Sequence, residues 1–130
     1  MVKFGYTILY VKDVERTIAF YEKAFGLKRK FVVDDGSYGE LDTGGTTLSF
    51  ASIPLAQSNL TSEMQTSTLS GKPFGIEIAF TTDDVDATYK KALAAGAVEE
   101  AKASYKPQGQ TVAYVRDPDG FLVEICTPMA

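Results

Sequence analysis

The sequence contains no histidine, and this limits the chemistry that its side chains can perform. This excludes the Ser-His-Asp and Cys-His arrangements of nucleophilic catalysis, and also the imidazole ligands that zinc usually takes. The single cysteine, Cys126, has no histidine to act as its base, and a lone cysteine is more often a small buried apolar residue than a nucleophile. Acid–base chemistry would therefore depend on carboxylates, and Glu77 and Glu124 both stand within β-like runs.

Size and composition indicate an ordinary globular protein of one domain, with 130 residues, 45% of them hydrophobic and 23% charged. The net charge of −4 argues against nucleic acid as a partner, because nucleic-acid binding needs a basic face. No apolar run reaches the ~18 residues of a membrane span. The N-terminus lacks a signal-peptide pattern, and one cysteine cannot form an internal disulfide. We therefore expect a cytoplasmic protein that does not bind membranes.

A repeated segment predicts the elements that position the two glutamates. Residues 6–14 and 77–85 are each a β-rich run that ends in Asp and Val and precedes an amphipathic stretch. In the first copy, apolar residues at helical spacing run from Asp13, a suitable N-cap, to Gly26, a suitable C-terminal stop. The second copy repeats this spacing and again ends on a glycine, at Gly96.

Three further β-like runs follow each predicted helix. They are residues 29–33, 38–41 and 46–51 in the first half, and 98–104, 111–116 and 121–127 in the second. Both halves are therefore predicted to be β-α-β-β-β, which gives an α+β fold of two tandem βαβββ modules, residues 1–53 and 75–130. The intervening segment 54–74 is rich in Ser and Thr and has no periodicity, so we expect it to be a linker or a lid.

Motifs along nearly the whole chain point to a known family. They are Tyr10-Val11-Lys12-Asp13, Ile18-Ala19-Phe20-Tyr21-Glu22, Phe25-Gly26, Ile78-Ala79-Phe80, Asp83-Asp84-Val85, Ala94-Ala95-Gly96-Ala97, the run from Val115 to Phe121, and Val123-Glu124. Together they resemble the vicinal-oxygen-chelate superfamily, which includes glyoxalase I, bleomycin-resistance proteins, fosfomycin-resistance enzymes and extradiol dioxygenases. The resemblance implies curved mixed sheets around a cup, a small-molecule ligand and a homodimer.

The resemblance also implies four site positions, at which metal-dependent members carry His or Gln, then Glu, His and Glu. In this sequence the four positions are Tyr6, Ser49, Glu77 and Glu124, and only Glu124 keeps the usual residue. The repeat supports the assignment, because Tyr6 corresponds to Glu77 and Ser49 to Glu124. We therefore expect these four residues to line one cavity and to bind the ligand there.

The four residues form a poor ligand set for zinc or the late first-row metals, so no metal cofactor is favoured. A divalent ion such as magnesium or manganese, held by Glu77 and Glu124, stays as an alternative. Without a metal, two neighbouring inward carboxylates cannot both ionise easily, and one should hold a proton near neutral pH. Such a pair would be a general acid/base or a receptor for a ligand.

Three functions are compatible with the resemblance. The first, which we favour, is a metal-free small-molecule-binding protein of the bleomycin-resistance kind. The second is a lyase or isomerase similar to lactoylglutathione lyase, and the third is a metal-free enzyme that uses Glu77 or Glu124 as a general base. A shift of one residue in strand register would instead turn Glu77 and Glu124 outwards. Independently of the register, Tyr6 could be only a wall residue of the cavity. Cys126, two residues after Glu124, shares its strand face and is expected to line the cavity as well.

Overall fold

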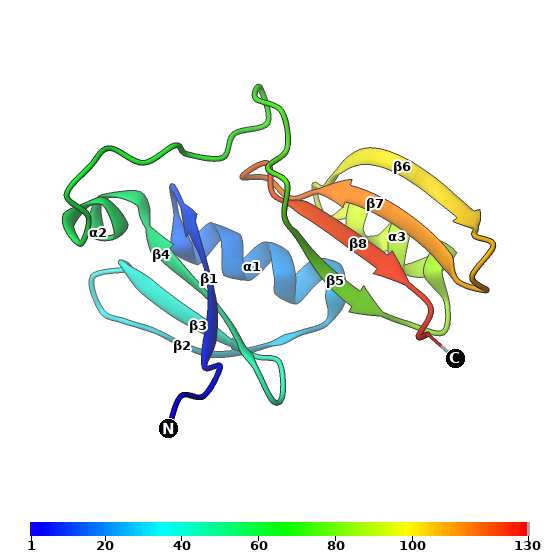
Figure 1. Cartoon of the computed structure of the whole chain (residues 1–130), viewed down its shortest axis with the longest axis horizontal. Coiled ribbons are helices and arrows are strands. Elements are labelled where there is room, and N and C mark those ends of the chain that lie inside the picture. Colours follow the sequence, from blue (N-terminus) through cyan, green and yellow to red (C-terminus); the bar gives the residue numbers. More distant parts are fainter. Residues whose placement is uncertain (130) are drawn as a thin grey trace. The chain divides into compact units, whose positions relative to one another are not determined.

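The computed structural model describes residues 1–129, and these form two compact units, each with one four-stranded sheet (Figure 1). Unit 1 comprises Met1–Glu22 and Gly26–Thr66, and unit 2 comprises Lys23–Phe25 and the chain from Ser67 onwards. The boundary between Thr66 and Ser67 falls inside the segment 54–74 that the sequence predicted as a linker or lid. Part of that segment therefore belongs to each unit.

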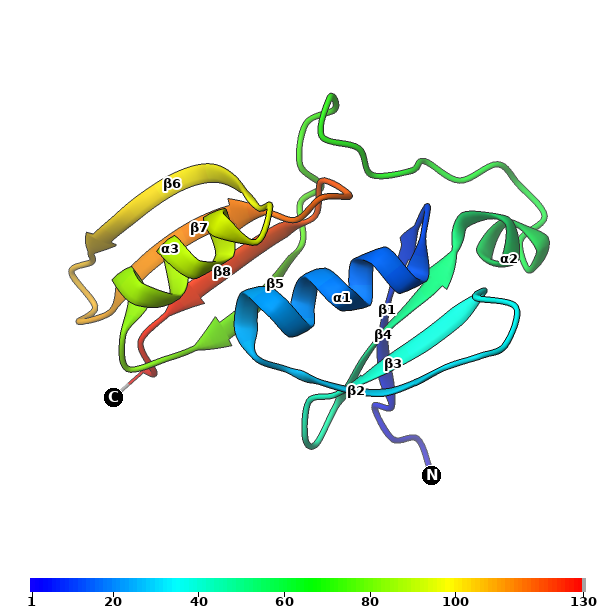
Figure 2. The ribbon, with the colours of Figure 1, turned by 180° about the vertical axis from the view of Figure 1, so that it is seen from behind.

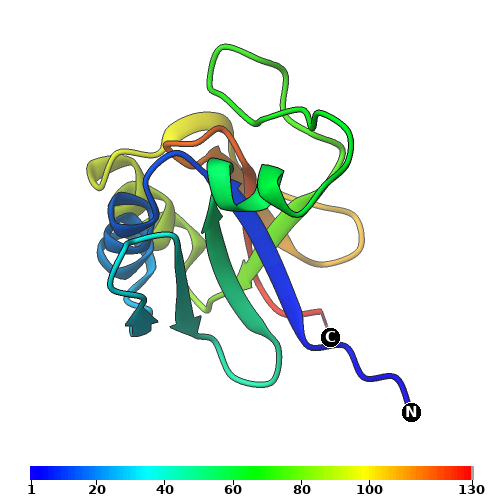
Figure 3. The same cartoon turned by 90° about the vertical axis from the view of Figure 1, so that its left-hand side faces the viewer.

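The first half of the chain is the predicted βαβββ module, followed by a short helix. Its elements are β1 (Tyr6–Val11), α1 (Val14–Phe25), β2 (Lys28–Val32), β3 (Tyr38–Asp42), β4 (Thr47–Ser52) and α2 (Ile53–Ser58). The sheet order is β1-β4-β3-β2, with β1 parallel to β4 and the other neighbours antiparallel. Seen from the side, β1 runs next to β4 at one edge of this sheet (Figure 3).

Helix α1 begins and ends where the sequence predicted. The carboxylate of Asp13 accepts a hydrogen bond from the Arg16 backbone N–H at 3.1 Å, which satisfies one free donor of the first turn. At the other end Gly26 adopts a φ of 69°, and its N–H donates to the Glu22 carbonyl at 3.0 Å. A side chain at this φ would be strained, so glycine is suited to end the helix.

The buried face of α1 packs on the sheet of unit 1 through aromatic and aliphatic contacts. The rings of Tyr21 and Phe50 stack with centroids 5.3 Å apart, and both side chains are fully buried. Next to them Ile18 reaches the backbone of Gly39, where an added Cβ would lie 2.5 Å from Ile18 Cδ1. The absence of a side chain at Gly39 therefore lets the helix approach the sheet closely.

Helix α2 corrects the expectation that residues 54–74 would lack regular structure. It begins at Ile53, where the Ser52 hydroxyl accepts a hydrogen bond from the Leu55 N–H at 3.3 Å and Pro54 occupies the first turn. A serine N-cap followed by a proline in the first turn is a normal helix start. Proline lacks a backbone N–H, but the first turn would leave that N–H unpaired in any case. The helix has six residues, which is too short to show a 3.6-residue periodicity.

Unit 2 repeats the βαβββ arrangement. Its elements are β5 (Glu77–Thr81), α3 (Val85–Ala94), β6 (Val98–Tyr105), β7 (Thr111–Arg116) and β8 (Leu122–Cys126). The sheet order is β5-β8-β7-β6, with β5 parallel to β8, and α3 lies across β6, β7 and β8 (Figure 2). No helix within residues 1–129 combines the length and hydropathy needed to cross a membrane.

Helix α3 starts as predicted and ends slightly earlier. Its N-cap is Asp84, whose carboxylate accepts the Ala87 N–H at 3.0 Å. The helix stops at Ala94, and the Ala95 N–H closes the last turn on the Lys91 and Ala92 carbonyls. Gly96, the predicted stop, instead turns the chain towards β6 with a φ of 114°. The glycine therefore marks the exit from the helix rather than its last residue.

Candidate functional site

The register of β5 against β8 decides which way the two predicted glutamates point. Ala79 lies opposite Glu124 in this parallel pair, so Glu77, Ala79 and Glu124 share one face of the sheet. Val123 and Ile125 point to the other face, where α3 packs, and are fully buried. The register prediction is therefore correct, although the side chain of Glu77 keeps substantial exposure to solvent.

The carboxyl groups of Glu77 and Glu124 are in hydrogen-bond contact. The bond to Glu124, together with partial burial and the charge of Glu124, raises the pKa of Glu77 to about 7. The pKa of Glu124 is lowered, first by the bond to Glu77 and then by bonds from Cys126 and Tyr114. The Tyr114 hydroxyl donates to Glu124 Oε1 at 3.2 Å. The two carboxyl groups therefore titrate as a pair, which holds one proton below neutral pH.

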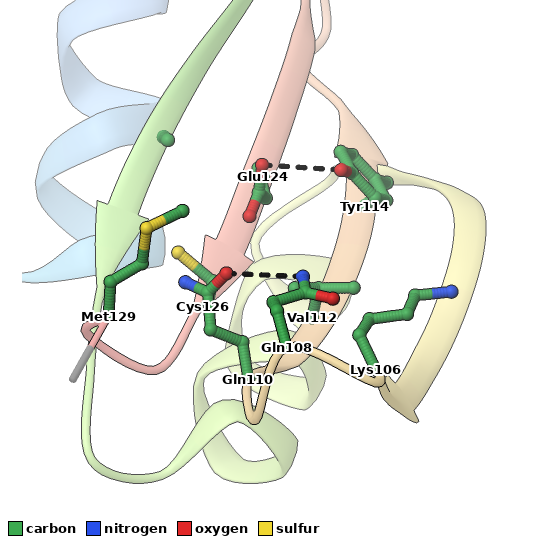
Figure 4. A pocket seen from close by; sticks show the side chains of 9 residues that line it. Lys106, Gln108, Gln110, Val112, Tyr114, Glu124, Cys126 and Met129 are labelled. Atoms are coloured by element: carbon green, nitrogen blue, oxygen red, sulfur yellow. Dashed lines mark hydrogen bonds between the residues drawn. The ribbon is translucent and has the colours of Figure 1, made fainter.

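Beside this pair lies a pocket of about 420 Å³ that is formed entirely by unit 2. The side chains that line it are drawn in Figure 4 and are those of Ala79, Lys106, Gln108, Gln110, Val112, Tyr114, Glu124, Cys126 and Met129. Gln110 is held in place, since its Nε2 donates to the Thr127 carbonyl at 2.8 Å. Its Oε1 accepts from Gln108 Nε2 at 3.3 Å. The pocket therefore combines amide, phenol, carboxyl and ammonium groups with a few apolar side chains.

Cys126 lines the pocket, as its position two residues after Glu124 predicted. The side chain is 5% exposed, and its thiol lies 3.7 Å from the Phe80 carbonyl oxygen. Burial, followed by the hydrogen bond to the Glu124 carboxylate and the negative charge of that group, raises the pKa of the thiol to about 11. A thiol that stays neutral is a weak nucleophile, so Cys126 belongs to the wall of the pocket.

Tyr6 and Ser49 occupy the equivalent positions in unit 1. Tyr6 is the first residue of β1, as Glu77 is of β5, and Ser49 is the third residue of β4, as Glu124 is of β8. Ser49 is fully buried and donates to the Thr7 carbonyl at 3.5 Å, whereas Tyr6 is 57% exposed. The predicted equivalence is therefore present within each sheet. That all four residues line one cavity stays a prediction, because two of them belong to each unit.

The sequence analysis missed two inward residues that lie opposite the predicted ones. Tyr114 on β7 faces Glu124, and Glu40 on β3 faces Ser49. Glu40 is 7% exposed, accepts a hydrogen bond from the Tyr38 hydroxyl at 2.8 Å, and has Lys30 Nζ at 3.7 Å from its Oε1. The observed pairing of Tyr114 with Glu124 leaves five residues, 117–121, between the paired ends of β7 and β8, and the predicted run boundaries alone did not give this register.

The donor set in the described residues does not fit a transition metal. Within residues 1–129 no three His, Cys, Asp or Glu side chains are grouped closely enough to hold an ion. The two carboxyl groups that are close to each other share a proton, and their other neighbours are a phenol and a neutral thiol. Zinc and the late first-row metals prefer imidazole and thiolate ligands. The side chains at this site therefore do not match the donors that these metals prefer.

The family model of the Glyoxalase/Bleomycin resistance protein/Dioxygenase superfamily matches residues 3–125. The chain belongs to this superfamily. A lactoylglutathione lyase of Arabidopsis thaliana is 31% identical over 128 residues, which are 95% of this chain and 43% of that protein. The chain thus spans less than half the length of this curated relative.

Two solved structures share the same fold. A glyoxalase-related enzyme from Fulvimarina pelagi superposes with a TM-score of 0.85 at 21% identity, over 98% of this chain and 89% of that one. A hypothetical protein from S. aureus gives a TM-score of 0.82 at 22% identity, over 98% and 95%. The α+β fold of two βαβββ modules that the sequence predicted is confirmed by these likenesses and by the observed topology.

Proposed function

We propose that this glyoxalase-superfamily protein binds a small organic ligand in the pocket of unit 2 and needs no metal ion to do so. The observation that supports the proposal most directly is the proton-sharing pair Glu77 and Glu124, which stands where metal-dependent relatives are expected to hold their ion. A pair that already shares a proton can donate and accept hydrogen bonds, which is what recognition of a polar organic group requires.

The size and lining of the pocket fit this proposal. A volume of about 420 Å³ is within the range of small-molecule sites, roughly 300–1,000 Å³. Gln108, Gln110 and Tyr114 provide neutral hydrogen-bonding groups, whereas Val112 and Met129 provide apolar contact. A ligand with an apolar body and one hydrogen-bonding head group could contact both the apolar and the hydrogen-bonding side chains of the pocket.

A ligand screen with matched variants tests the proposal. Compounds that raise the thermal unfolding midpoint of the wild-type protein should do so much less in Glu124→Gln, because Gln offers an amide where the ligand meets a carboxylate. Glu100→Gln is the matched control, since Glu100 lies on β6 and is exposed. A compound that binds the wild type and Glu124→Gln equally well would place the binding site elsewhere.

Metal analysis separates the metal-free proposal from its alternative. Protein purified without chelators should contain no stoichiometric zinc, nickel or iron, and EDTA should leave ligand affinity unchanged. About one equivalent of such a metal per chain would contradict the proposal. Ligand binding that requires added magnesium or manganese would instead favour an ion held by Glu77 and Glu124.

A catalytic alternative has one specific observation in its favour. A carboxyl pKa of about 7, as at Glu77, suits a general acid or base at neutral pH. Incubation with lactoylglutathione, the compound in the relative's name, would test a lyase activity of the glyoxalase kind. Turnover that depends on pH near 7 and is lost in Glu77→Gln would establish this alternative over simple binding.

A homodimer is the assembly that we propose, and the surface of β1 supports it. Tyr6, Ile8 and Tyr10 project from one face of this edge strand and are 57%, 42% and 37% exposed. Exposed large apolar side chains on an edge strand favour pairing with another chain. Sedimentation at micromolar concentration should give twice the 14.1 kDa chain mass, and Ile8→Asp should shift it towards the monomer. A monomeric wild type would contradict the assembly.

We also propose a cytoplasmic location, because the one cysteine is buried as a thiol and the fold depends on no disulfide bond. Cell fractionation with an epitope-tagged chain checks this directly. Recovery in a membrane or secreted fraction would contradict it.

A further inference from the structure

The side chain of Arg116 joins two segments of unit 2 that are distant in sequence. Arg116 is the last residue of β7, lies on the same face as Tyr114, and is only 8% exposed. Its Nε donates to the Gly120 carbonyl at 3.0 Å. Its Nη2 donates to the Thr68 carbonyl at 3.0 Å, and its Nη1 to the Leu69 carbonyl at 3.4 Å. One guanidinium therefore connects the β7–β8 turn to the chain that precedes β5.

We call residues 67–74 the strap, and two further contacts hold it on the β7–β8 turn. An added Cβ on Gly120 would lie 2.5 Å from the carbonyl carbon and oxygen of Thr68, so the two backbones are in direct contact. The rings of Phe74 and Phe121 meet edge to face with centroids 6.1 Å apart. In Figure 1 the strap passes beside this turn before the chain enters β5. The strap is therefore attached near both of its ends.

The strap leads directly to the candidate site. After Phe74 only Gly75 and Ile76 precede Glu77, the first residue of β5. Strand β5 is at the edge of the sheet, so Glu77 has a strand neighbour on one side only, where it pairs with Leu122. The same Leu122 pairs with Arg116 on its other side. The row of residues that contains Glu77 therefore also contains the arginine that holds the strap.

We propose that Arg116 is a positioning residue, which fixes the strap on the β7–β8 turn and so places the carboxyl group of Glu77 against that of Glu124. The inference rests on the proposed function for the importance of this pair. An arginine on the inward face of a pocket strand is a natural candidate for binding an anionic ligand. Here, however, each of its three nitrogen atoms donates to a backbone carbonyl. Arg116 thus acts on the site through the backbone.

Arg116→Lys is the first test, because lysine keeps the charge but lacks the planar fork that reaches three carbonyls. Amide hydrogen exchange of residues 68–77 should become about tenfold faster or more, since several bonds from a charged donor are lost. At constant pH the carboxyl ¹³C resonance of Glu77 should move, whereas that of Glu99 on β6 should not. Arg29→Lys, a change at an exposed arginine of unit 1 bonded to Glu15 and Glu22, is the control and should alter neither signal.

A second variant keeps Arg116 and loosens the other end of the strap. Phe74→Ala removes the ring contact with Phe121 and should change strap exchange and the Glu77 resonance in the same direction. Unchanged strap exchange in both variants would refute the attachment. Faster strap exchange with an unmoved Glu77 resonance would refute the positioning role and leave Arg116 purely structural. If strap exchange becomes faster and the Glu77 resonance moves, but no screened compound binds the protein, the positioning role is upheld. Only the proposed function is then contradicted.

Discussion

Replacing Glu124 by glutamine should lower the pKa of Glu77, and the size of this effect can be worked out from the site. Two unit charges about 4 Å apart interact by about 1 kcal/mol in water and about 4 kcal/mol at an effective dielectric constant near 20. Glu77 is substantially exposed, so solvent screening places the interaction towards the lower value. Because about 1.36 kcal/mol corresponds to one pH unit, the pKa should fall from about 7 by roughly one unit. Partial burial should keep it above the ordinary 4.5 of a glutamate.

The assay is a titration of side-chain carboxyl ¹³C resonances in the wild type, in Glu124→Gln and in the control Glu100→Gln. The titration has a consequence for stability, because the folded state binds the Glu77 proton more tightly than the unfolded chain does. The free energy of unfolding should therefore fall as the pH rises from about 4.5 to about 7, and this fall should be smaller in Glu124→Gln. A wild-type Glu77 that titrates near 4.5 would refute the shared proton. A pKa still near 7 in Glu124→Gln would show that burial, rather than Glu124, raises it.

Three further predictions concern single residues. At pH 8 Cys126 should react with iodoacetamide far more slowly than a cysteine in an unfolded chain, because the pKa of its thiol is raised to about 11. Glu124→Gln should make this reaction faster, and mass spectrometry can follow the rate in both proteins. Asp84→Ala should lower the free energy of unfolding by about 1 kcal/mol in urea titrations, since the Ala87 N–H loses its cap. Phe50→Ala should lower it by about 3–5 kcal/mol, because this ring is fully buried; a loss below 1 kcal/mol would contradict the packing described for α1.

Much of the fold was predictable because the sequence repeats its local signals. The Asp13 cap and the Gly26 stop fix α1, and strand alternation places Glu77 and Glu124 on the same face. Helix α2 escaped prediction because one and a half turns leave no periodic pattern, and only Ser52 and Pro54 mark its start. Local residue types thus predicted the elements that are long enough to carry a period.

The rest of the site depends on which residues face each other across strands, and this is not a local property. Tyr114 becomes a partner of Glu124 only once β7 and β8 are paired in the observed register. The strap was expected to be a linker or a lid because its composition is polar. Its attachment uses the backbone carbonyls of Thr68 and Leu69, which any residue type would provide. Composition therefore could not distinguish an attached segment from a free one.

The two sheets share a backbone plan but differ in electrostatic character. On β3 and β4 the inward carboxylate is Glu40, which has the ammonium group of Lys30 3.7 Å away and faces Ser49. On the equivalent β7 and β8 the carboxylate is Glu124, which faces the phenol of Tyr114 and has a second carboxyl group beside it. The inward carboxylate of one copy is thus paired with an ammonium group, whereas that of the other lies beside a second carboxyl group. The same βαβββ arrangement therefore presents a different set of charged groups on each of its two sheets.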